Sequence, residues 1–149
     1  MTDPNVKSRD RIVKKSEKEI FVASEINHTP YDMIDLRNDT SLEQLLKYPV
    51  LIYSHPMLMN EERAELLKQY VQQGGILILG CRSGCKDMNG QFVMLPQPGL
   101  LKELTGTDIR DFTFQSPNEE PVSMKWQDKE LTVPVFHDLL EPLENTRVL

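Results

Sequence analysis

The stretch from residue 50 to residue 79 decides the fold. It reads Val50-Leu-Ile-Tyr-Ser54, then a helical segment opened by Asn60, then Gly74-Gly75 and Ile76-Leu-Ile-Leu79. Both apolar runs are short and rich in branched residues, which is typical of parallel strands buried on both faces. Asn60 predicts the N-cap of the helix, and the paired glycines predict its end. Strand, helix and strand joined by tight turns predict a right-handed βαβ unit.

A long helix, a strand and a short helix are expected ahead of this unit. Apolar residues at helical spacing predict an amphipathic helix over residues 5–26, ended by Asn27 in a left-handed conformation. The short apolar run of residues 31–36 predicts a further strand. Residues 41–47 predict a short helix with Ser41 as its N-cap.

The second half of the chain begins with an irregular stretch over residues 81–99. A short helix over residues 100–104, stopped by Gly106, and a strand over residues 109–114 are expected next. Apolar and polar residues then alternate, turn at residues 127–129, and alternate back, which predicts a C-terminal β-hairpin. The apolar positions of this hairpin are Val122, Met124, Trp126, Leu131, Val133 and Val135, and Pro134 places the second strand at an edge.

Composition and length argue against several classes of protein. The chain has 149 residues and a formal net charge of −6, whereas a dedicated nucleic-acid-binding protein needs a basic face. No apolar run approaches the roughly 20 residues of a membrane-spanning helix, so we expect neither nucleic acid nor membrane as a partner. A complete (β/α)₈ barrel needs about 250 residues and is excluded. Two cysteines without a leader sequence predict a cytoplasmic protein.

The loop after the second strand is the candidate functional site, because ligands of open α/β sheets bind beyond the carboxyl ends of strands. It reads Gly80-Cys-Arg-Ser-Gly-Cys-Lys-Asp87. Three interpretations stay open: a nucleophile elbow built on cysteine, a glycine-rich anion cradle, and a structural loop whose charged residues pair with each other or with a neighbouring chain.

Spacing argues against the elbow. An elbow would place its nucleophile at position 82, which is Arg82, and Cys81 stands one place early. No base is in sight for that thiol, since His55 and His137 could approach it only through the fold and neither has the expected spacing.

The anion cradle and a metal centre are also weakly supported. Arg82, Ser83 and Lys86 would be the donors of the cradle, but the Gly-Lys-Ser/Thr ending of a phosphate loop is absent. Cys81 and Cys85 are not joined by a histidine or a second cysteine pair, as a zinc site would require. The sequence therefore predicts no catalytic, cofactor-binding or metal-binding residue.

Several segments, taken in order, resemble one known family. They are residues 48–53, a helix ending Tyr70-Val-Gln-Gln-Gly-Gly75, Arg82-Ser-Gly84 followed by Lys86-Asp87, Pro96-Gln-Pro-Gly99, and Asp138-Leu-Leu-Glu-Pro142. Their order and spacing resemble the trimerisation domain of bacterial β-galactosidases of glycoside hydrolase family 42, over about residues 21–149.

The resemblance implies an α/β fold: a flavodoxin-like, class I glutamine amidotransferase-like, three-layer domain with a mainly parallel sheet plus the C-terminal β-hairpin. It implies a non-catalytic module without a cofactor, because the family hydrolyses terminal β-D-galactosides in a separate barrel that holds its acid and nucleophile. The implied partners are further copies of the chain, as a trimer, and the catalytic barrel of the parent enzyme. The family-like loop residues are expected to be structural or to lie at an interface; they are Arg82, Ser83, Gly84, Lys86, Asp87, Pro98 and Gly99.

Two departures from the family bear on the fold. The usual first strand, ahead of the helix over residues 5–26, is absent, and the family continues beyond residue 149. We therefore expect residues 1–149 to form a single domain that is a piece of a longer protein. Without the first strand, the strands over residues 31–36 and 50–54 are expected to pair directly, or another copy of the chain is expected to cover the open edge. The alternative function is a small flavodoxin-like hydrolase or ligand-binding sensor that uses the loop over residues 81–87.

Overall fold

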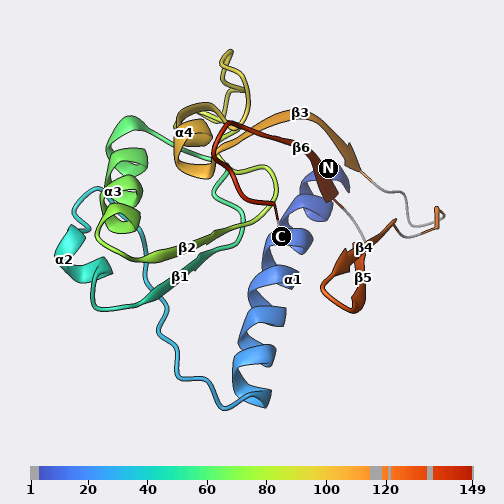
Figure 1. Cartoon of the computed structure of the whole chain (residues 1–149), viewed down its shortest axis with the longest axis horizontal. Helices are drawn as coiled ribbons and strands as arrows, with labels where there is room; N and C mark the ends of the chain where they lie inside the picture. Colours follow the sequence, from blue (N-terminus) through green and yellow to red (C-terminus); the bar gives the residue numbers. More distant parts are fainter. Residues whose placement is uncertain (1–3, 115–118, 121, 134–135, 149) are drawn as a thin grey trace.

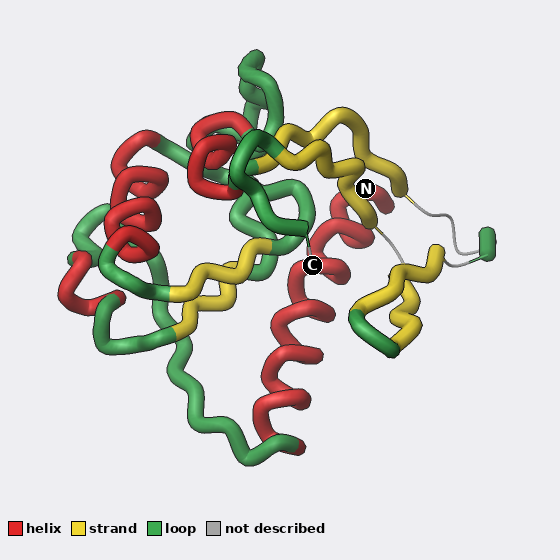
Figure 2. The backbone as a smooth tube through the Cα atoms, viewed as in Figure 1, coloured by secondary structure: helices red, strands yellow, loops and turns green. Residues whose placement is uncertain are grey.

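The computed structural model describes residues 4–114, 119–120, 122–133 and 136–148. The helices are α1 (Pro4–Ile26), α2 (Leu42–Leu45), α3 (Glu61–Gln72) and α4 (Lys102–Thr105), and a 3₁₀ turn, η1 (Gly99–Leu101), leads into α4. The strands are β1 (Val50–Tyr53), β2 (Ile76–Leu79), β3 (Thr107–Phe114), β4 (Val122–Trp126), β5 (Lys129–Val133) and β6 (Phe136–Pro142). They form a parallel pair, β1–β2, and two antiparallel pairs, β3–β6 and β4–β5 (Figures 1 and 2). The fold is therefore mixed α/β with short sheets. The expectation of one mainly parallel sheet is wrong for the described strands, because only β1 and β2 pair in parallel.

The predicted βαβ unit is confirmed. The Asn60 side chain accepts a hydrogen bond from the Arg63 N–H at 3.0 Å and caps α3, and Gly74 ends the helix with φ 94°. Gly75 cannot carry a side chain, because a Cβ there would lie 2.2 Å from the ring of Tyr70. The Tyr70 ring is fully buried, and its hydroxyl donates a hydrogen bond to the Tyr48 carbonyl at 2.9 Å. This bond joins the end of α3 to the segment just before β1.

The core lies between α3, η1 and one face of the parallel sheet. Met59, Leu67 and Leu101 are its buried centre. Partly buried apolar side chains of the sheet, of α3 and of the neighbouring segments pack around that centre; they are Leu36, Tyr53, Ala64, Leu77, Leu79 and Leu104. This packing holds η1 and α4 against the βαβ unit.

The opposite face of the parallel sheet is uncovered, and the expectation of strands buried on both faces is wrong for this chain. Val50, Ile52, Ile76 and Ile78 are 42%, 52%, 58% and 49% exposed. The other residues of the two strands, which point to α3, are only partly exposed. A parallel sheet is buried on both faces only when helices lie on both. Among the described elements, α3 alone packs substantially on this sheet.

Residues 31–36 do not form the predicted strand. The structure leaves this segment without ladder hydrogen bonds, so it pairs neither with β1 nor with another strand. Its polar side chains are instead bonded locally and to the segment before β1: Asp35 pairs with Arg37, and Asp32 accepts from the Tyr48 hydroxyl at 2.8 Å. A short apolar run has the composition of a strand, but it forms one only where another strand offers an edge to pair with. Here β1 pairs only with β2, so residues 31–36 have no partner.

The ends of the first two helices follow local signals closely. The left-handed residue after α1 is His28, with φ 52°, and not Asn27 as predicted. The Thr29 N–H reaches back to the Ser24 carbonyl at 2.9 Å, which places the Schellman turn one residue later. Ser41 caps α2 as predicted, in a reciprocal capping box with Gln44.

The C-terminal half combines confirmed and unpredicted elements. The short helix stopped by Gly106 and the strand after it are confirmed as α4 and β3. The hairpin is confirmed as β4–β5, with Met124 opposite Leu131. Its turn is shorter than predicted, because Lys129 belongs to β5 and stands opposite Trp126. Pro134 and Val135 lie outside the described residues. β6 was not predicted; it pairs with β3 from Thr107–Pro142 to Phe114–Phe136.

Candidate functional site

The loop after β2 is packed against the loop after β1. A Cβ on Gly80 would lie 1.7 Å from the Ser54 carbonyl oxygen, so only glycine allows this approach of two backbones. The Lys86 N–H and carbonyl also bond to the Met57 carbonyl and the Met59 N–H. The loops after β1 and β2, at the carboxyl end of the parallel sheet, are therefore packed and hydrogen-bonded together.

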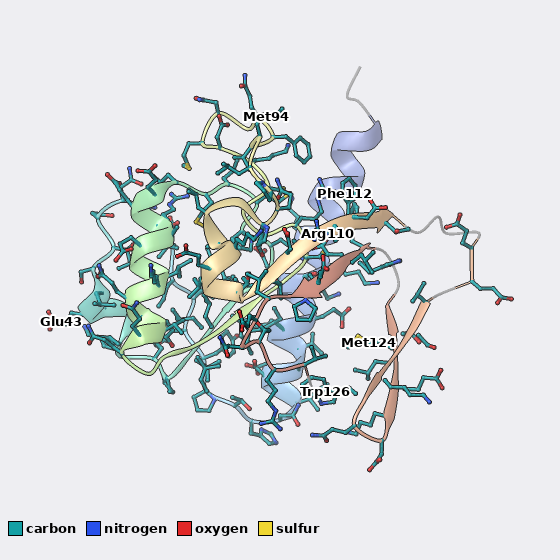
Figure 3. The ribbon with its side chains drawn as sticks, turned by 45° about the horizontal axis from the view of Figure 1, so that its top comes forward. Glu43, Met94, Arg110, Phe112, Met124 and Trp126 are labelled. Carbon is teal, nitrogen blue, oxygen red and sulfur yellow. The ribbon has the colours of Figure 1, made fainter. Side chains whose placement is uncertain are left out.

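Arg82 links these two loops to the antiparallel β3–β6 sheet. Its backbone N–H donates to a carboxylate oxygen of Asp138 at 2.8 Å. Its guanidinium carbon lies 4.0 Å from the ring centre of Phe112, a residue of β3 labelled in Figure 3. The rings of Phe92 and Phe136 lie further out, at 5.4 and 5.7 Å. Arg82 has φ 66°, a conformation that costs a non-glycine residue about 1–3 kcal/mol and persists only where its surroundings hold it.

The other predicted loop residues are used within the loop. The Ser83 hydroxyl is buried and donates to the Gly80 carbonyl at 2.6 Å. The Lys86 ammonium lies 5.4 Å from the ring centre of Phe92. One carboxylate oxygen of Asp87 accepts from the N–H groups of Asn89 and Gln91, each at 2.9 Å, and so closes the turn that follows.

Gly84, Pro98 and Gly99 bring a second segment against the loop. Gly84 has φ 68°, and a Cβ there would lie 2.4 Å from the Pro98 carbonyl oxygen. A Cβ on Gly99, which has φ 64°, would lie 3.0 Å from the Gly84 carbonyl oxygen. Pro98 itself is fully buried after a cis peptide bond. The structure therefore packs the segment of Pro98 and Gly99 directly against Gly84 of the loop.

This geometry does not resemble an anion cradle. Asp138 already accepts from the Arg82 N–H, and a carboxylate there repels a second anion. The Arg82 guanidinium and the Lys86 ammonium lie over aromatic rings, and the Ser83 hydroxyl is bonded to backbone. Of the three predicted donors, the Ser83 hydroxyl is thus used within the loop, and the two cations are held against aromatic rings.

A histidine lies beside Cys81, but the thiol of Cys81 is not activated as a nucleophile. The structure places His55 beside Cys81, which spacing alone did not predict: the Nδ1 atom of His55 is 3.6 Å from the thiol and 3.2 Å from the Cys81 carbonyl oxygen. The Nε2 atom of His55 is 2.8 Å from the Ser16 hydroxyl of α1. Burial, and next the Asp138 carboxylate, raise the pKa of the Cys81 thiol to about 11, while Arg82 opposes the shift. A thiol that is protonated at neutral pH is a poor nucleophile.

Other kinds of site find little support in the described residues. His137 lies on β6 opposite Thr113, and its Nδ1 atom is buried without a hydrogen-bond partner there. Within the described ranges, no group of three potential ligands is arranged for a metal ion. None of the described helices has the length and apolarity to span a membrane. Two shallow hollows of about 180 and 250 Å³ flank α3, and neither includes a residue of the loop over residues 80–87.

Sequence comparisons relate the chain to β-galactosidases. The family described as the β-galactosidase trimerisation domain matches residues 28–148. β-Galactosidase BgaA of Clostridium cellulovorans is 36% identical over 70 residues, which cover 47% of this chain and 11% of that protein. β-Galactosidase BgaB of a Geobacillus species is 33% identical over 70 residues and is covered to 10%. The chain therefore spans about a tenth of the length of the curated relatives that it matches.

Solved structures share the fold at low sequence identity. The β-galactosidase of the haloarchaeon Halorubrum lacusprofundi superposes with a TM-score of 0.62 at 21% identity, over 72% of this chain and 15% of that one. The cold-adapted β-galactosidase of Rahnella sp. R3 gives a TM-score of 0.63 at 14% identity, over 72% of this chain and 16% of that one. Because the matched family extends over most of the sequence, the chain belongs to the β-galactosidase trimerisation domains, which are modules of assembly rather than of catalysis.

Proposed function

We propose that this chain associates with further copies of itself and so holds together the subunits of a β-galactosidase. The single observation that carries this proposal is the family match over residues 28–148. The chain accounts for about a tenth of the matched relatives, which leaves room in a parent protein for a separate catalytic barrel. The parent then hydrolyses terminal β-D-galactosides in that barrel, as the names of the relatives suggest.

The charged residues around the candidate site support an assembly module. Asp108 binds Lys102 at 3.0 Å, and Glu141 pairs with Arg110, so these carboxylates are held by cations. Asp138 holds the Arg82 N–H. A retaining glycosidase needs two carboxylates about 5 Å apart that both face a substrate. Of these carboxylates, Asp138 holds the loop over residues 80–87, and the other two pair with cations of α4 and β3.

The proposal extends to the domain as a whole. We place residues 1–149 in one flavodoxin-like domain that lacks its usual first strand, and the βαβ unit with one covered face supports this placement. In that fold a further strand and further helices would complete the sheet. The free thiols of Cys81 and Cys85 support a cytoplasmic location, where thiols stay reduced.

The loop residues have a structural role in this proposal. Arg82, Ser83, Gly84, Lys86, Asp87, Pro98 and Gly99 form the packed unit that joins the two halves of the chain. Through it, the position of the β3–β6 sheet is tied to that of the βαβ unit. Rigid placement of its parts is what an assembly module needs to present the same surface in every copy.

Sedimentation equilibrium of the chain over a wide range of concentration tests the proposal. We expect a mass that rises with concentration to that of three chains. A mass of one chain at every concentration contradicts the proposed function. As a companion measurement, the purified chain is expected not to hydrolyse a nitrophenyl galactoside, because it contains no barrel; turnover above that of a mock purification would make it an enzyme in its own right.

A further inference from the structure

The turn over residues 87–91 contains Asn89, the only asparagine of the chain that is followed by glycine. The turn belongs to the loop that projects away from the helices and strands near residue 90 in Figure 1. The Asp87 N–H donates to the Gln91 carbonyl at 2.8 Å, and the Gly90 N–H donates to the Asp87 carbonyl at 3.0 Å. Gly90 has φ 80°, the left-handed conformation that glycine adopts without a steric cost.

The Asn89 side chain is open to water and to the backbone of the next residue. Residues 88–92 are all exposed. In the described part of the chain, the Asn89 carboxamide makes no hydrogen bond, whereas those of Asn27 and Asn60 are bonded to the backbone. No atom lies within 4 Å of the place where a Cβ of Gly90 would stand. Neither packing nor a side chain on residue 90 therefore hinders contact between the Gly90 nitrogen and the Asn89 carboxamide.

We propose that Asn89 is a site of spontaneous modification, at which water converts the asparagine into isoaspartate. The backbone nitrogen of Gly90 loses its proton to hydroxide and attacks the carboxamide carbon of Asn89. A new C–N bond closes a five-membered succinimide ring, and the old C–N bond of the carboxamide breaks, so that its nitrogen leaves as ammonia. Water then opens the ring, mainly to isoaspartate. One water is consumed and one ammonia released, with no oxidant or reductant. This inference is independent of the proposed function.

The fold slows this reaction without preventing it. The Gly90 N–H donates to the Asp87 carbonyl, so this hydrogen bond must open before the nitrogen can attack. Exposed loop tips open locally at little cost in free energy, because few buried contacts are lost when they do. Asn89 is therefore expected to react more slowly in the folded chain than in the chain unfolded by urea, and still faster than every other asparagine.

The product cannot keep the turn as it stands. One carboxylate oxygen of Asp87 accepts from the N–H groups of Asn89 and Gln91, each at 2.9 Å. Isoaspartate lengthens the main chain by one carbon between these two donors, and it adds a carboxylate beside that of Asp87, where like charges repel. The pairing of Lys86 with Phe92 on either side of the turn is then weakened.

Phe92 connects the turn to the loop after β2. Its ring centre lies 5.4 Å from the Arg82 guanidinium carbon and 5.4 Å from the Lys86 ammonium. Loss of the turn geometry at Asn89 therefore moves this ring away from both cations. The modification is expected to loosen the loop over residues 80–87 at its outer end.

The first experiment measures the reaction in the folded full chain during long incubation in mildly alkaline buffer. Trypsin releases Asn89 in the peptide of residues 87–102 and Asn38 in that of residues 38–47, so mass spectrometry follows each separately. Asn38 is the matched control, because it is exposed and lies in a turn but precedes Asp39. We expect Asn89 to gain one mass unit at least tenfold faster than Asn38. Gly90→Ala should slow Asn89 at least tenfold, because a Cβ there hinders ring closure.

The second experiment measures the consequence for the fold. The isoaspartyl chain is separated from the unmodified chain by ion exchange and unfolded in urea. Asn89→Asp is the matched control, since it adds the same charge without lengthening the main chain. We expect the isoaspartyl chain to unfold at a lower urea concentration than Asn89→Asp. Phe92→Ala, which removes the ring, should reduce the difference between the two.

Each result supports or overturns the inference. If Asn89 reacts no faster than Asn38 in the folded chain, or reacts only once the chain is unfolded in urea, the turn protects it and the site is wrong. If Gly90→Ala reacts as fast as the unmodified chain, the Gly90 nitrogen is not favoured by the absence of a side chain, and the mechanism is wrong. If the isoaspartyl chain and Asn89→Asp unfold at the same urea concentration, the turn tolerates the longer main chain and the loosening is wrong.

Discussion

Asp138 of β6 accepts a hydrogen bond from the backbone N–H of Arg82 at 2.8 Å, across 56 positions of the chain. The same Arg82 extends its guanidinium over Phe112, which stands opposite Asp138 in the β3–β6 ladder. Backbone and side chain of one residue are therefore held by two paired residues of the antiparallel sheet. These contacts offset the cost of the left-handed backbone at Arg82.

Removal of the Asp138 carboxylate is expected to destabilise the fold. A hydrogen bond to a charged group contributes about 1.5–3 kcal/mol, so Asp138→Ala should lower the free energy of unfolding in urea by that amount. Asp138→Asn keeps an acceptor and should cost about half as much. Asp128→Ala, in the exposed turn of the hairpin, is the control and should stay within about 0.5 kcal/mol. An unchanged midpoint for Asp138→Ala would mean that this bond does not join the two sheets.

Arg82 and Phe112 should be energetically coupled. A double-mutant cycle with Arg82→Gln and Phe112→Leu is expected to give an interaction energy of about 1–2 kcal/mol, since the cation is partly desolvated over the ring. Arg82→Gln combined with Leu131→Ala, on the separate hairpin, should give additive effects. If the losses of unfolding free energy for Arg82→Gln and Phe112→Leu are additive, the contact between the two side chains does not stabilise the fold.

Cys81 should react slowly with alkylating agents at neutral pH. Burial and the Asp138 carboxylate raise its pKa to about 11, so in a Cys85→Ser background the alkylation rate should keep increasing with pH up to that value. The folded thiol holds its proton where an unfolded thiol loses it, so stability should fall as the pH rises from about 9 to about 11. An apparent pKa well below about 8.5 that is abolished by His55→Ala would identify an activated thiol and revive the hydrolase alternative.

Gly84 and Gly90 both have a positive φ, but replacement of each by alanine should destabilise the fold by different amounts. Gly84 has φ 68° and would place a Cβ 2.4 Å from the Pro98 carbonyl oxygen, whereas Gly90 has φ 80° and open space around it. Gly90→Ala should cost about 1–2 kcal/mol from backbone strain alone. Gly84→Ala should cost at least about 1 kcal/mol more, because the second segment must move away. Equal losses in urea unfolding would show that the close approach is not required.

Local signals made much of the fold predictable. Asn60, Ser41 and Gly106 define helix ends through bonds within a few residues of themselves, and such bonds form wherever the sequence provides them. The hairpin register also follows from alternation on either side of one turn.

The elements that depend on distant partners were not predictable in the same way. Residues 31–36 have the composition of a strand but no edge to pair with. β6 contains Asp138 and Pro142, residue types depleted in strands, yet the long partner β3 holds it in a ladder. The contact of His55 with Cys81 arises because two loops follow adjacent parallel strands, and no spacing in the sequence encodes it.

Trp126 is the only tryptophan of the chain, and none of the four tyrosines lies on the hairpin. The ultraviolet emission of tryptophan therefore reports on one side of one hairpin and on nothing else in the molecule. An indole that is partly in water emits at longer wavelength than one enclosed by apolar side chains. Simple dilution in a fluorimeter cuvette, with no dye attached, thus gives an optical record of whether that side of the hairpin is wet or covered.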